Sequence, residues 1–299
     1  MSSLTLNGRT LTWGERTYVM GILNITPDSF SGDGLLAPLP PSESKGGEGP
    51  GVRNVFRRFL AAGVDILDVG GESTRPGAQP VDAEEELRRV LPVIQAIAAE
   101  FPEALISVDT CKAAVAEAAL QAGACIVNDV WGLRADPALA DVVMRHNAAV
   151  VLMHNRSNPA SVEVRERLGG AYLGAEYRDL LEDVKRELMA SVAIAHSAGI
   201  PDERILLDPG IGFGKTVGQN LELINRLGEI RSLGFPILLG ASRKSFIGYT
   251  LDLPPDQRLE GTAAAVAVGI DRGADIVRVH DVEAMVRVAR MTDAIVRAQ

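Results

Sequence analysis

Acidic, amide and basic side chains follow several short apolar stretches of this chain. They are Asn24, Asp109, Asn128, Asp208, Arg278 and His280. Carboxylates accept hydrogen bonds, amides both donate and accept them, and arginine and histidine can bind anions. Any one of these residues alone is as readily a helix cap or a hydrogen-bonded loop group. Together at one end of a sheet, they would form a polar binding site with acidic and basic parts.

The stretch DPGIGFGKTVGQN at residues 208–220 has the glycines and the lysine of a phosphate-binding loop. Its spacing argues against that interpretation, because Pro209 stands where a P-loop has its first glycine and lacks the N–H that would face phosphate. The glycines at 210, 212 and 214 also miss the G-x-G-x-x-G spacing of a dinucleotide site. The stretch instead predicts a short strand that ends at Asp208, followed by a glycine-rich turn into a helix.

Eight apolar stretches alternate with eight helical stretches along the chain. The predicted strands are 18–25, 64–70, 104–109, 124–128, 148–153, 204–208, 235–240 and 275–279. The predicted helices are 52–62, 82–100, 112–122, 137–146, 175–198, 218–233, 258–272 and 281–297. This order favours an α/β fold of the (β/α)8 TIM-barrel type, with a doubly wound open sheet as the main alternative.

The N-terminal residues 1–14 alternate apolar and polar side chains around Asn7-Gly8. This pattern predicts a β-hairpin that closes the bottom of the barrel. We expect one barrel domain over residues 1–299. Residues 35–51 are rich in Pro, Gly and Ser and are expected to form a mobile loop insertion, either a lid or a neutral addition.

In a TIM barrel the loops that follow the strands carry the chemistry. The loops predicted here include GGESTRPG at 70–77, Met153-His154, and GASRKS at 240–245, besides the polar residues above. Five of the 30 basic residues are lysines, so Lys215 and Lys244 in two glycine-flanked turns stand out. We therefore expect the polar residues to meet at one mouth of the barrel.

The composition narrows the classes of protein and partner. A length of 299 residues suits one barrel with additions, and 46% hydrophobic residues suffice for a large core. The net charge of −9 argues against a nucleic-acid partner. No apolar run reaches membrane-spanning length, and the start MSSLTLNGRT lacks the features of a signal peptide. Cys111 and Cys125 are expected to be buried thiols in a cytoplasmic protein.

Seven ordered motifs resemble the dihydropteroate synthase family of pterin-binding TIM barrels. They are GILNITPDSFS (21–31), DVGGESTRPGA (68–78), SVDT (107–110), VND (127–129), DPGIGFGK (208–215), GASRKSFIG (240–248) and RVHDV (278–282). The resemblance implies a transferase of folate biosynthesis. The amine of 4-aminobenzoate would attack the CH2 carbon of 6-hydroxymethyl-7,8-dihydropterin diphosphate, releasing pyrophosphate and 7,8-dihydropteroate. It also implies Mg2+ as cofactor and a cytoplasmic homodimer.

The resemblance assigns roles to individual residues. The pterin-binding set is Asp109, Asn128, Asp208, Lys244, Met153 and Phe213. The diphosphate-binding set is Asn24, Thr74, Arg278 and His280, with Asn24 also the Mg2+ ligand. The aminobenzoate-binding set is Arg75, Pro76, Ser245 and Phe30. The catalytic set is Arg278, His280, Lys244 and Arg75, and none of these is required as a nucleophile.

The loop after the first strand departs from the family pattern. Gly32 precedes Asp33-Gly34, and the long Pro/Gly segment follows, so Asp33 is not assigned a role. Two alternative functions are consistent with a pterin-binding barrel. A corrinoid-dependent methyltransferase would need D-x-H-x-x-G, where this chain has Ile194 in place of the Asp before His196. A pterin-binding protein without turnover would be distinguished by an assay for pyrophosphate release that depends on 4-aminobenzoate.

Overall fold

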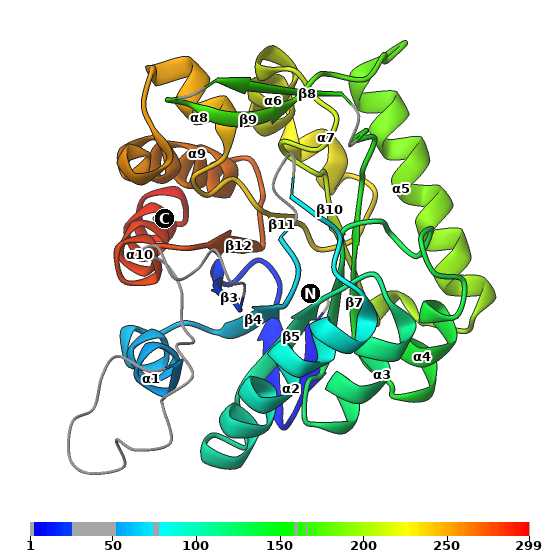
Figure 1. The fold of residues 1–299 in the computed structure, drawn as a ribbon. Helices are drawn as coiled ribbons and strands as arrows, with labels where there is room; N and C mark the ends of the chain where they lie inside the picture. Colours follow the sequence, from blue (N-terminus) through cyan, green and yellow to red (C-terminus); the bar gives the residue numbers. More distant parts are fainter. Residues whose placement is uncertain (1–2, 26–51, 74–77, 159–160, 166, 299) are drawn as a thin grey trace.

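A ring of parallel strands forms the centre of the computed structural model, which describes residues 3–25, 52–73, 78–158, 161–165 and 167–298 (Figure 1). In this part of the chain the strands are β3 (Tyr18–Asn24), β4 (Ile66–Gly70), β5 (Leu105–Asp109), β6 (Ile126–Asp129), β7 (Ala149–Met153), β10 (Ile205–Asp208), β11 (Leu238–Leu239) and β12 (Ile276–Val279). Each pairs with its neighbours in chain order. A parallel bridge between Leu207 and Ile237 joins β10 to the β11 side. The sheet is therefore a closed TIM barrel, as the sequence predicted, and not an open sheet.

Helices surround the ring on its outer side. The described ones are α1 (Val52–Ala62), α2 (Ala83–Glu100), α3 (Ala113–Gln121), α4 (Leu139–Arg145), α5 (Leu180–Ser197), α6 (Val217–Asn225), α7 (Leu227–Arg231), α8 (Ser245–Leu251), α9 (Leu259–Asp271) and α10 (Val282–Val296). Asp82 caps α2 by accepting a 2.8 Å hydrogen bond from the N–H of Glu85. Among the described helices, none has the length and apolar character needed to cross a bilayer.

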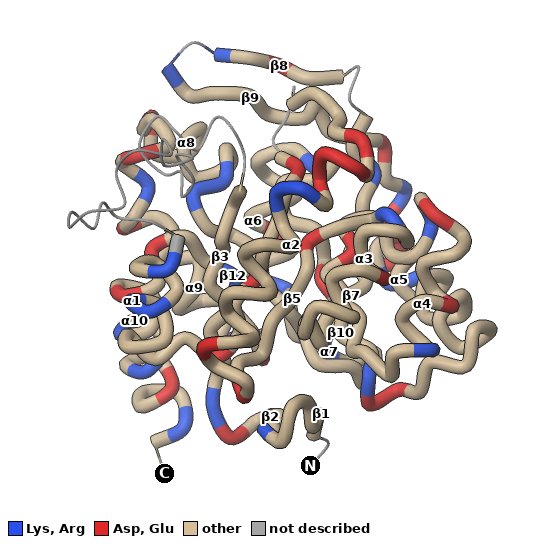
Figure 2. The backbone as a smooth tube through the Cα atoms, turned by 60° about the horizontal axis from the view of Figure 1, so that its bottom comes forward, with Lys and Arg blue, Asp and Glu red and all other residues tan. Residues whose placement is uncertain are grey.

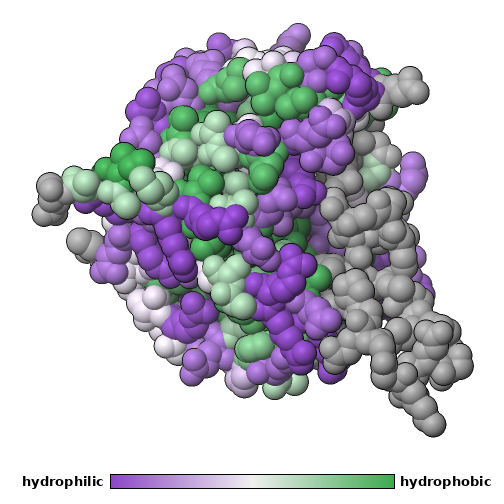
Figure 3. All heavy atoms as spheres, turned by 90° about the vertical axis from the view of Figure 1, so that its left-hand side faces the viewer, coloured by the Kyte–Doolittle hydropathy of each residue, from purple (hydrophilic) through white to green (hydrophobic). Residues whose placement is uncertain are grey.

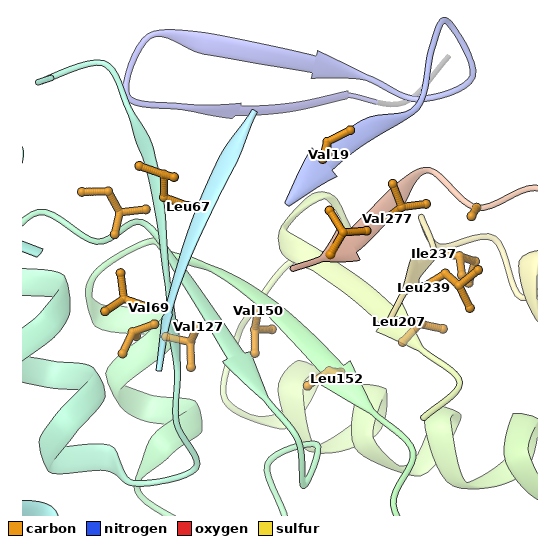
Figure 4. Close-up of a cluster of buried hydrophobic side chains, with 14 of the residues drawn as sticks. Val19, Leu67, Val69, Val127, Val150, Leu152, Leu207, Ile237, Leu239 and Val277 are labelled. Carbon is orange, nitrogen blue, oxygen red and sulfur yellow. The ribbon is translucent and has the colours of Figure 1, made fainter. Parts of the chain in front are cut away.

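Alternation along the strands divides the buried residues into two cores. Outward side chains such as Val19, Leu67 and Val127 pack against the helices (Figure 4). Inward side chains at the lower levels, such as Met20 and Ile66, form a second core inside the ring. Because a strand side chain points to the opposite face every second residue, the same alternation points the last residues of the strands into the upper end of the ring.

The N-terminal hairpin closes the lower end of the barrel. Its strands are β1 (Ser3–Leu6) and β2 (Arg9–Thr12), and the turn places Asn7 and Gly8 at positive φ. Apolar side chains of the hairpin segment, including Leu4 and Trp13, belong to the inner core. Figure 2 shows this hairpin at one end of the molecule and the hairpin β8–β9 at the other. The predicted closure of the bottom is thus confirmed.

Several elements differ from the sequence prediction. The hairpin of β8 (Val162–Arg165) and β9 (Gly169–Tyr172) lies in a stretch without a predicted element, because β8 is largely exposed and carries no buried apolar alternation. The predicted helix 175–198 begins only at Leu180, after its cap Asp179. The predicted helix 218–233 is two helices, α6 and α7, and α8 lies outside the eight predicted helical stretches.

Two further differences concern a strand and a cysteine. The predicted strand 235–240 is reduced to Leu238–Leu239. Pro236 has no N–H for a ladder hydrogen bond, although its carbonyl accepts one of 2.9 Å from Leu207. Cys125 is buried in the inner core, as expected, whereas Cys111 is only partly buried.

Candidate active site

The carboxyl ends of the strands bring polar side chains to one level of the barrel. Strand register pairs Asn24 with Gly70, Gly70 with Asp109, and Asp109 with Asn128. On the other side of the ring, Asp208 pairs with Met153. Asp109, Asn128, Asp208 and Met153 are buried, and Asn24 is partly buried. The residues predicted from separate motifs therefore come together at the carboxyl ends of the strands, at the mouth of the barrel.

Arg278 of β12 lies between two carboxylates on neighbouring strands. Its Nε donates to Asp68 Oδ2 at 2.6 Å and its Nη2 donates to Asp109 Oδ2 at 2.6 Å. Burial raises the pKa of Asp109 to about 7, although the charge of Arg278 opposes this shift. Burial alone would lower the pKa of Arg278, but both carboxylates raise it above its usual value. The guanidinium is thus a fixed cation whose charge is balanced by two acids.

Asp68 is a member of this cluster that the sequence analysis did not single out. It is fully buried on β4, one level below the mouth, and Asn128 donates to its Oδ2 at 3.4 Å. Its Oδ1 has no hydrogen-bond partner among the described residues. Asp68 could have been predicted from its position two residues before Gly70, because alternate residues of a strand point to the same face, here the inside of the barrel.

A second wall of the mouth consists of Asp208 and Lys244. Asp208 Oδ1 accepts a 2.7 Å hydrogen bond from the N–H of Gly210. Gly240 leaves the space between the two charged groups open, since a Cβ there would lie 3.6 Å from Asp208 Oδ2 and 3.8 Å from Lys244 Nζ. Burial lowers the pKa of Lys244 to about 8, and Asp208 opposes that shift. Burial also raises the pKa of Asp208, opposed first by Lys244.

The glycine turn after β10 borders this wall. Its glycines have φ values of 70°, 85° and 70° at positions 210, 212 and 214, which L side chains disfavour. Lys244 Nζ donates to the carbonyl of Ile211 and lies 4.5 Å from the ring centroid of Phe213. The turn therefore holds an aromatic ring and a cation at the edge of the mouth, and it is not a nucleotide loop.

His280 and Ser245 lie at two further positions around the mouth. His280 follows β12, and its Nδ1 lies 3.1 Å from Ser242 Oγ. Ser245 is the first residue of α8 and is partly buried. The neighbouring Arg243 donates two hydrogen bonds to Asp281, one of 2.9 Å from Nε and one of 2.5 Å from Nη2. Its positive charge is therefore paired with Asp281, and Arg243 is not assigned to a ligand.

Comparison with known proteins decides the family. The model of the family described as pterin binding enzyme matches residues 20–280, nearly the whole chain. This chain belongs to the pterin-binding enzymes. A dihydropteroate synthase of Clostridium beijerinckii is 48% identical over 285 residues, covering 95% of this chain and 96% of the relative. That of Bacillus subtilis is 48% identical over 284 residues, covering 95% and 90%.

Solved structures agree with this membership of the pterin-binding enzymes. A Yersinia pestis dihydropteroate synthase in complex with a sulfonamide drug has a TM-score of 0.85 at 38% identity, covering 99% of this chain and 100% of that one. A Xanthomonas albilineans dihydropteroate synthase with 4-aminobenzoic acid has a TM-score of 0.84 at 39% identity, covering 100% of both. The expected function and enzyme class are confirmed: the chain is a transferase of the dihydropteroate synthase type, in folate biosynthesis.

Some predicted residues of this pterin-binding enzyme lie outside the described part of the chain. These are Phe30, Asp33, Thr74, Arg75, Pro76 and the insertion 35–51. The described end of the 70–77 loop is held by Glu72, which pairs with Lys112. Lys112 also pairs with the buried Glu86 at 2.5 Å. The contacts at the start of this loop are thus with α2 and with the residue preceding α3.

Proposed function

We propose that this mouth binds 6-hydroxymethyl-7,8-dihydropterin diphosphate and 4-aminobenzoate and joins them to 7,8-dihydropteroate. The observation that carries the proposal is one mouth with two parts: a carboxylate wall at Asp208 and an arginine fork at Arg278, whose charge acts on Asp208. Release of pyrophosphate that depends on added 4-aminobenzoate tests it directly. Hydrolysis of the pterin diphosphate at the same rate without the amine would contradict it.

The pterin ring is assigned to the Asp208 side of the mouth. A carboxylate can accept two parallel N–H bonds from the guanidine-like edge of a pterin, as it does from arginine. Asp208 takes that role, and Asp109 and Asn128 bind the rest of the polar edge. Lys244 donates to a ring acceptor. The buried side chains of Met153 and Phe213 form the apolar walls of the slot.

The diphosphate is assigned to Arg278 and His280. The carbon–oxygen bond to the diphosphate breaks with its electron pair on the departing oxygen, and the arylamine nitrogen forms the new carbon–nitrogen bond and then loses a proton. A fixed guanidinium stabilises the negative charge that develops on the leaving group. The arylamine is largely neutral near pH 7, so no nucleophilic side chain or strong base is needed. Catalysis is mainly electrostatic help to departure together with orientation.

Mg2+ fits this donor set as an ion held chiefly by the substrate. No group of three or more His, Cys, Asp or Glu side chains in the described residues forms an all-protein metal cage. Mg2+ typically takes one or two protein oxygens and completes its shell with phosphate and water. Asn24 at the mouth is the residue proposed to supply that oxygen. The ion would add positive charge at the diphosphate.

The aminobenzoate is assigned to the α8 side of the mouth. Ser245 begins α8, where main-chain N–H groups are not used within the helix. We place the carboxylate of the aminobenzoate there. Phe30, Arg75 and Pro76 are proposed to surround the aryl ring, and Thr74 is proposed to contact the diphosphate; these four lie outside the described residues.

Pterin binding should weaken above about pH 8. The pKa of Lys244 is lowered to about 8, so its ammonium form is complete below that pH and is lost as the pH rises through it. We expect the affinity for 6-hydroxymethylpterin, measured by calorimetry across this range, to fall on the alkaline side. In Lys244→Arg the guanidinium stays charged, so that alkaline fall should disappear. An unchanged fall in Lys244→Arg would show that another group titrates.

A homodimer through α9 and α10 is proposed as the assembly. Leu259, Val268, Met291 and Ile295 on these adjacent helices are 39%, 43%, 62% and 63% exposed. Figure 3 views the side of the molecule that carries these helices, and hydrophobic patches interrupt its polar surface. Burial of such side chains against a second copy would remove them from water. The cytoplasmic location stays a prediction from the sequence.

The dimer proposal predicts a loss of association in one double variant. Met291→Asp with Ile295→Asp should elute as a monomer in size exclusion with light scattering, because two charges would be buried at the interface. Met144→Asp, at a similarly exposed apolar residue on α4, serves as the control and should keep the wild-type mass. A double variant with the same mass as the wild type would exclude this face.

A further inference from the structure

Lys215 is a buried lysine behind the glycine turn, and it has no role in the chemistry proposed above. Only 3% of the surface of Lys215 is exposed to solvent. The Nζ donates to the carbonyls of Gly210 at 2.8 Å and Phe213 at 3.1 Å, and lies 3.0 Å from His154 Nδ1. These three acceptors match the three N–H groups of an ammonium ion. The side chain of Lys215 therefore links the beginning of the glycine turn, at Gly210, to its later part, at Phe213.

None of these three partners is a carboxylate. His154 Nε2 lies 3.0 Å from Glu187 Oε2, and Arg156 pairs with the same Glu187. Burial lowers the pKa of His154 to about 4, so its ring is neutral near pH 7. With Nδ1 accepting from Lys215, the proton lies on Nε2 and is donated to Glu187. Lys215 is thus linked to the carboxylate of Glu187 only indirectly, through the neutral imidazole of His154.

Gly210 connects Lys215 to Asp208 through the backbone. The Gly210 carbonyl accepts from Lys215, while the Gly210 N–H donates to Asp208 Oδ1. A Cβ at Gly210 would lie 1.8 Å from the carbonyl oxygen of His154, so the turn is pressed against the chain behind it. One oxygen of Asp208 is therefore fixed by the turn, and the other faces the space above Gly240.

The charge of Lys215 also acts on Asp208. The groups that lower the pKa of Asp208 against its burial are Lys244, the Gly210 N–H, Arg278 and Lys215. Of the three cations, Lys244 and Arg278 stand on the ligand side of the mouth, and Lys215 stands behind the turn. Burial lowers the pKa of Lys215 to about 7, opposed first by Asp208, so its ammonium form prevails on the acid side of neutrality. The charged groups around it are Asp208, Lys244, Glu187 and Arg156, and His154 is neutral. When a ligand binds to Lys244 and Arg278, Lys215 would remain as the cation near Asp208 that makes no contact with the ligand.

We propose that Lys215 is a positioning residue for pterin recognition, which holds the Gly210–Phe213 turn and keeps Asp208 ionised and oriented. This inference rests on the proposed pterin role of Asp208. A neutral side chain at position 215 would lose the hydrogen bonds to the turn and the positive charge behind Asp208. Loss of a nearby positive charge raises the pKa of a carboxyl group, so Asp208 would become protonated at higher pH.

Calorimetric titration with 6-hydroxymethylpterin from about pH 5 to 9 tests the inference on the full-length protein. Lys215→Met should bind roughly tenfold more weakly at about pH 6, where the ammonium form of Lys215 prevails. The acid side of its affinity profile should also move up by about one pH unit, which a general loss of stability would not produce. Lys215→Gln restores a hydrogen-bond donor without the charge, and should recover part of the affinity but keep the displaced acid side.

The controls separate this inference from the proposed site. Lys185→Met, which removes a lysine paired with Glu182 on α5, should bind as the wild type does. Asp208→Asn should lose binding; if it binds pterin normally, the proposed site is wrong. If Asp208→Asn loses binding but both Lys215 variants keep the wild-type affinity and pH profile, the role of Lys215 alone is overturned. Failure of both Lys215 variants to fold, judged by circular dichroism, would make the lysine a stability residue and also overturn it.

Discussion

Arg278→Ala is expected to lower kcat/KM for the pterin diphosphate by about 10³-fold. The guanidinium is the cation assigned to the departing diphosphate, so both kcat and the affinity for this substrate should fall together. Removal also leaves Asp68 and Asp109 without the positive charge that each contacts at 2.6 Å. Loss of one partner of a buried ion pair costs about 3–5 kcal/mol, so the free energy of unfolding should fall as well.

Two further variants separate catalysis from stability in this prediction. Arg278→Lys keeps a positive charge but not the planar fork, so it should stay folded and still lose most of the activity. Arg58→Ala removes an exposed arginine that pairs with Glu283, and its kinetics should match the wild type. Steady-state release of pyrophosphate at saturating substrates provides the measurement. Wild-type turnover in Arg278→Ala under those conditions would refute the diphosphate role.

Asp208→Asn is expected to weaken pterin binding by roughly 10²-fold or more, since loss of one partner of a buried charged hydrogen bond costs about 2–5 kcal/mol. The amide has nearly the same shape as the carboxyl group, so the glycine turn can stay in place. It presents an NH2 where the pterin edge presents donors, and it carries no charge to balance Lys244. KM for the pterin diphosphate should therefore rise far more than KM for 4-aminobenzoate.

The matched control is Asp271→Asn on α9, an exposed carboxylate that pairs with Arg272. This variant should have wild-type values of both KM constants. Isothermal titration with 6-hydroxymethylpterin gives an independent measure of affinity for both variants. Equal rises in the two KM constants for Asp208→Asn would point to a collapsed pocket and not to a lost pterin contact.

The sequence predicted the barrel well because its repeating signal is strong. Eight buried strands of β-branched residues alternate with amphipathic helices, and the strand ends carry polar residues that apolar strands would not otherwise need. The Asn7-Gly8 turn identified the hairpin at the bottom in the same way. The layer formed by Asp109, Asn128 and Asp208 follows from that topology, because parallel strands end at one side of a barrel.

The features that were missed depend on three-dimensional contacts that no local pattern encodes. Asp68 lies in the middle of an apolar strand, and its pairing with Arg278 joins residues far apart in the chain. Lys215 stood out by its rarity, but its hydrogen bonds to the turn need the φ values that only the folded glycines adopt. The strand β8 alternates apolar and polar residues, but it is only four residues long and largely exposed, so its pairing with β9 was not predicted.

The junction between β10 and the short strand β11, called the seam below, has fewer bridged residues than the other junctions of the barrel. Most neighbouring strands are joined by ladders of several residues, whereas β10 and the β11 side meet at the bridge between Leu207 and Ile237, next to Pro236. Asp208 stands on one side of this seam, and Gly240 and Lys244 follow on the other. The slot between acid and lysine therefore lies at the junction of the ring that has the fewest bridged residues. A side chain in place of Gly240 would narrow the slot, since its Cβ would lie 3.6 Å from Asp208 Oδ2 and 3.8 Å from Lys244 Nζ.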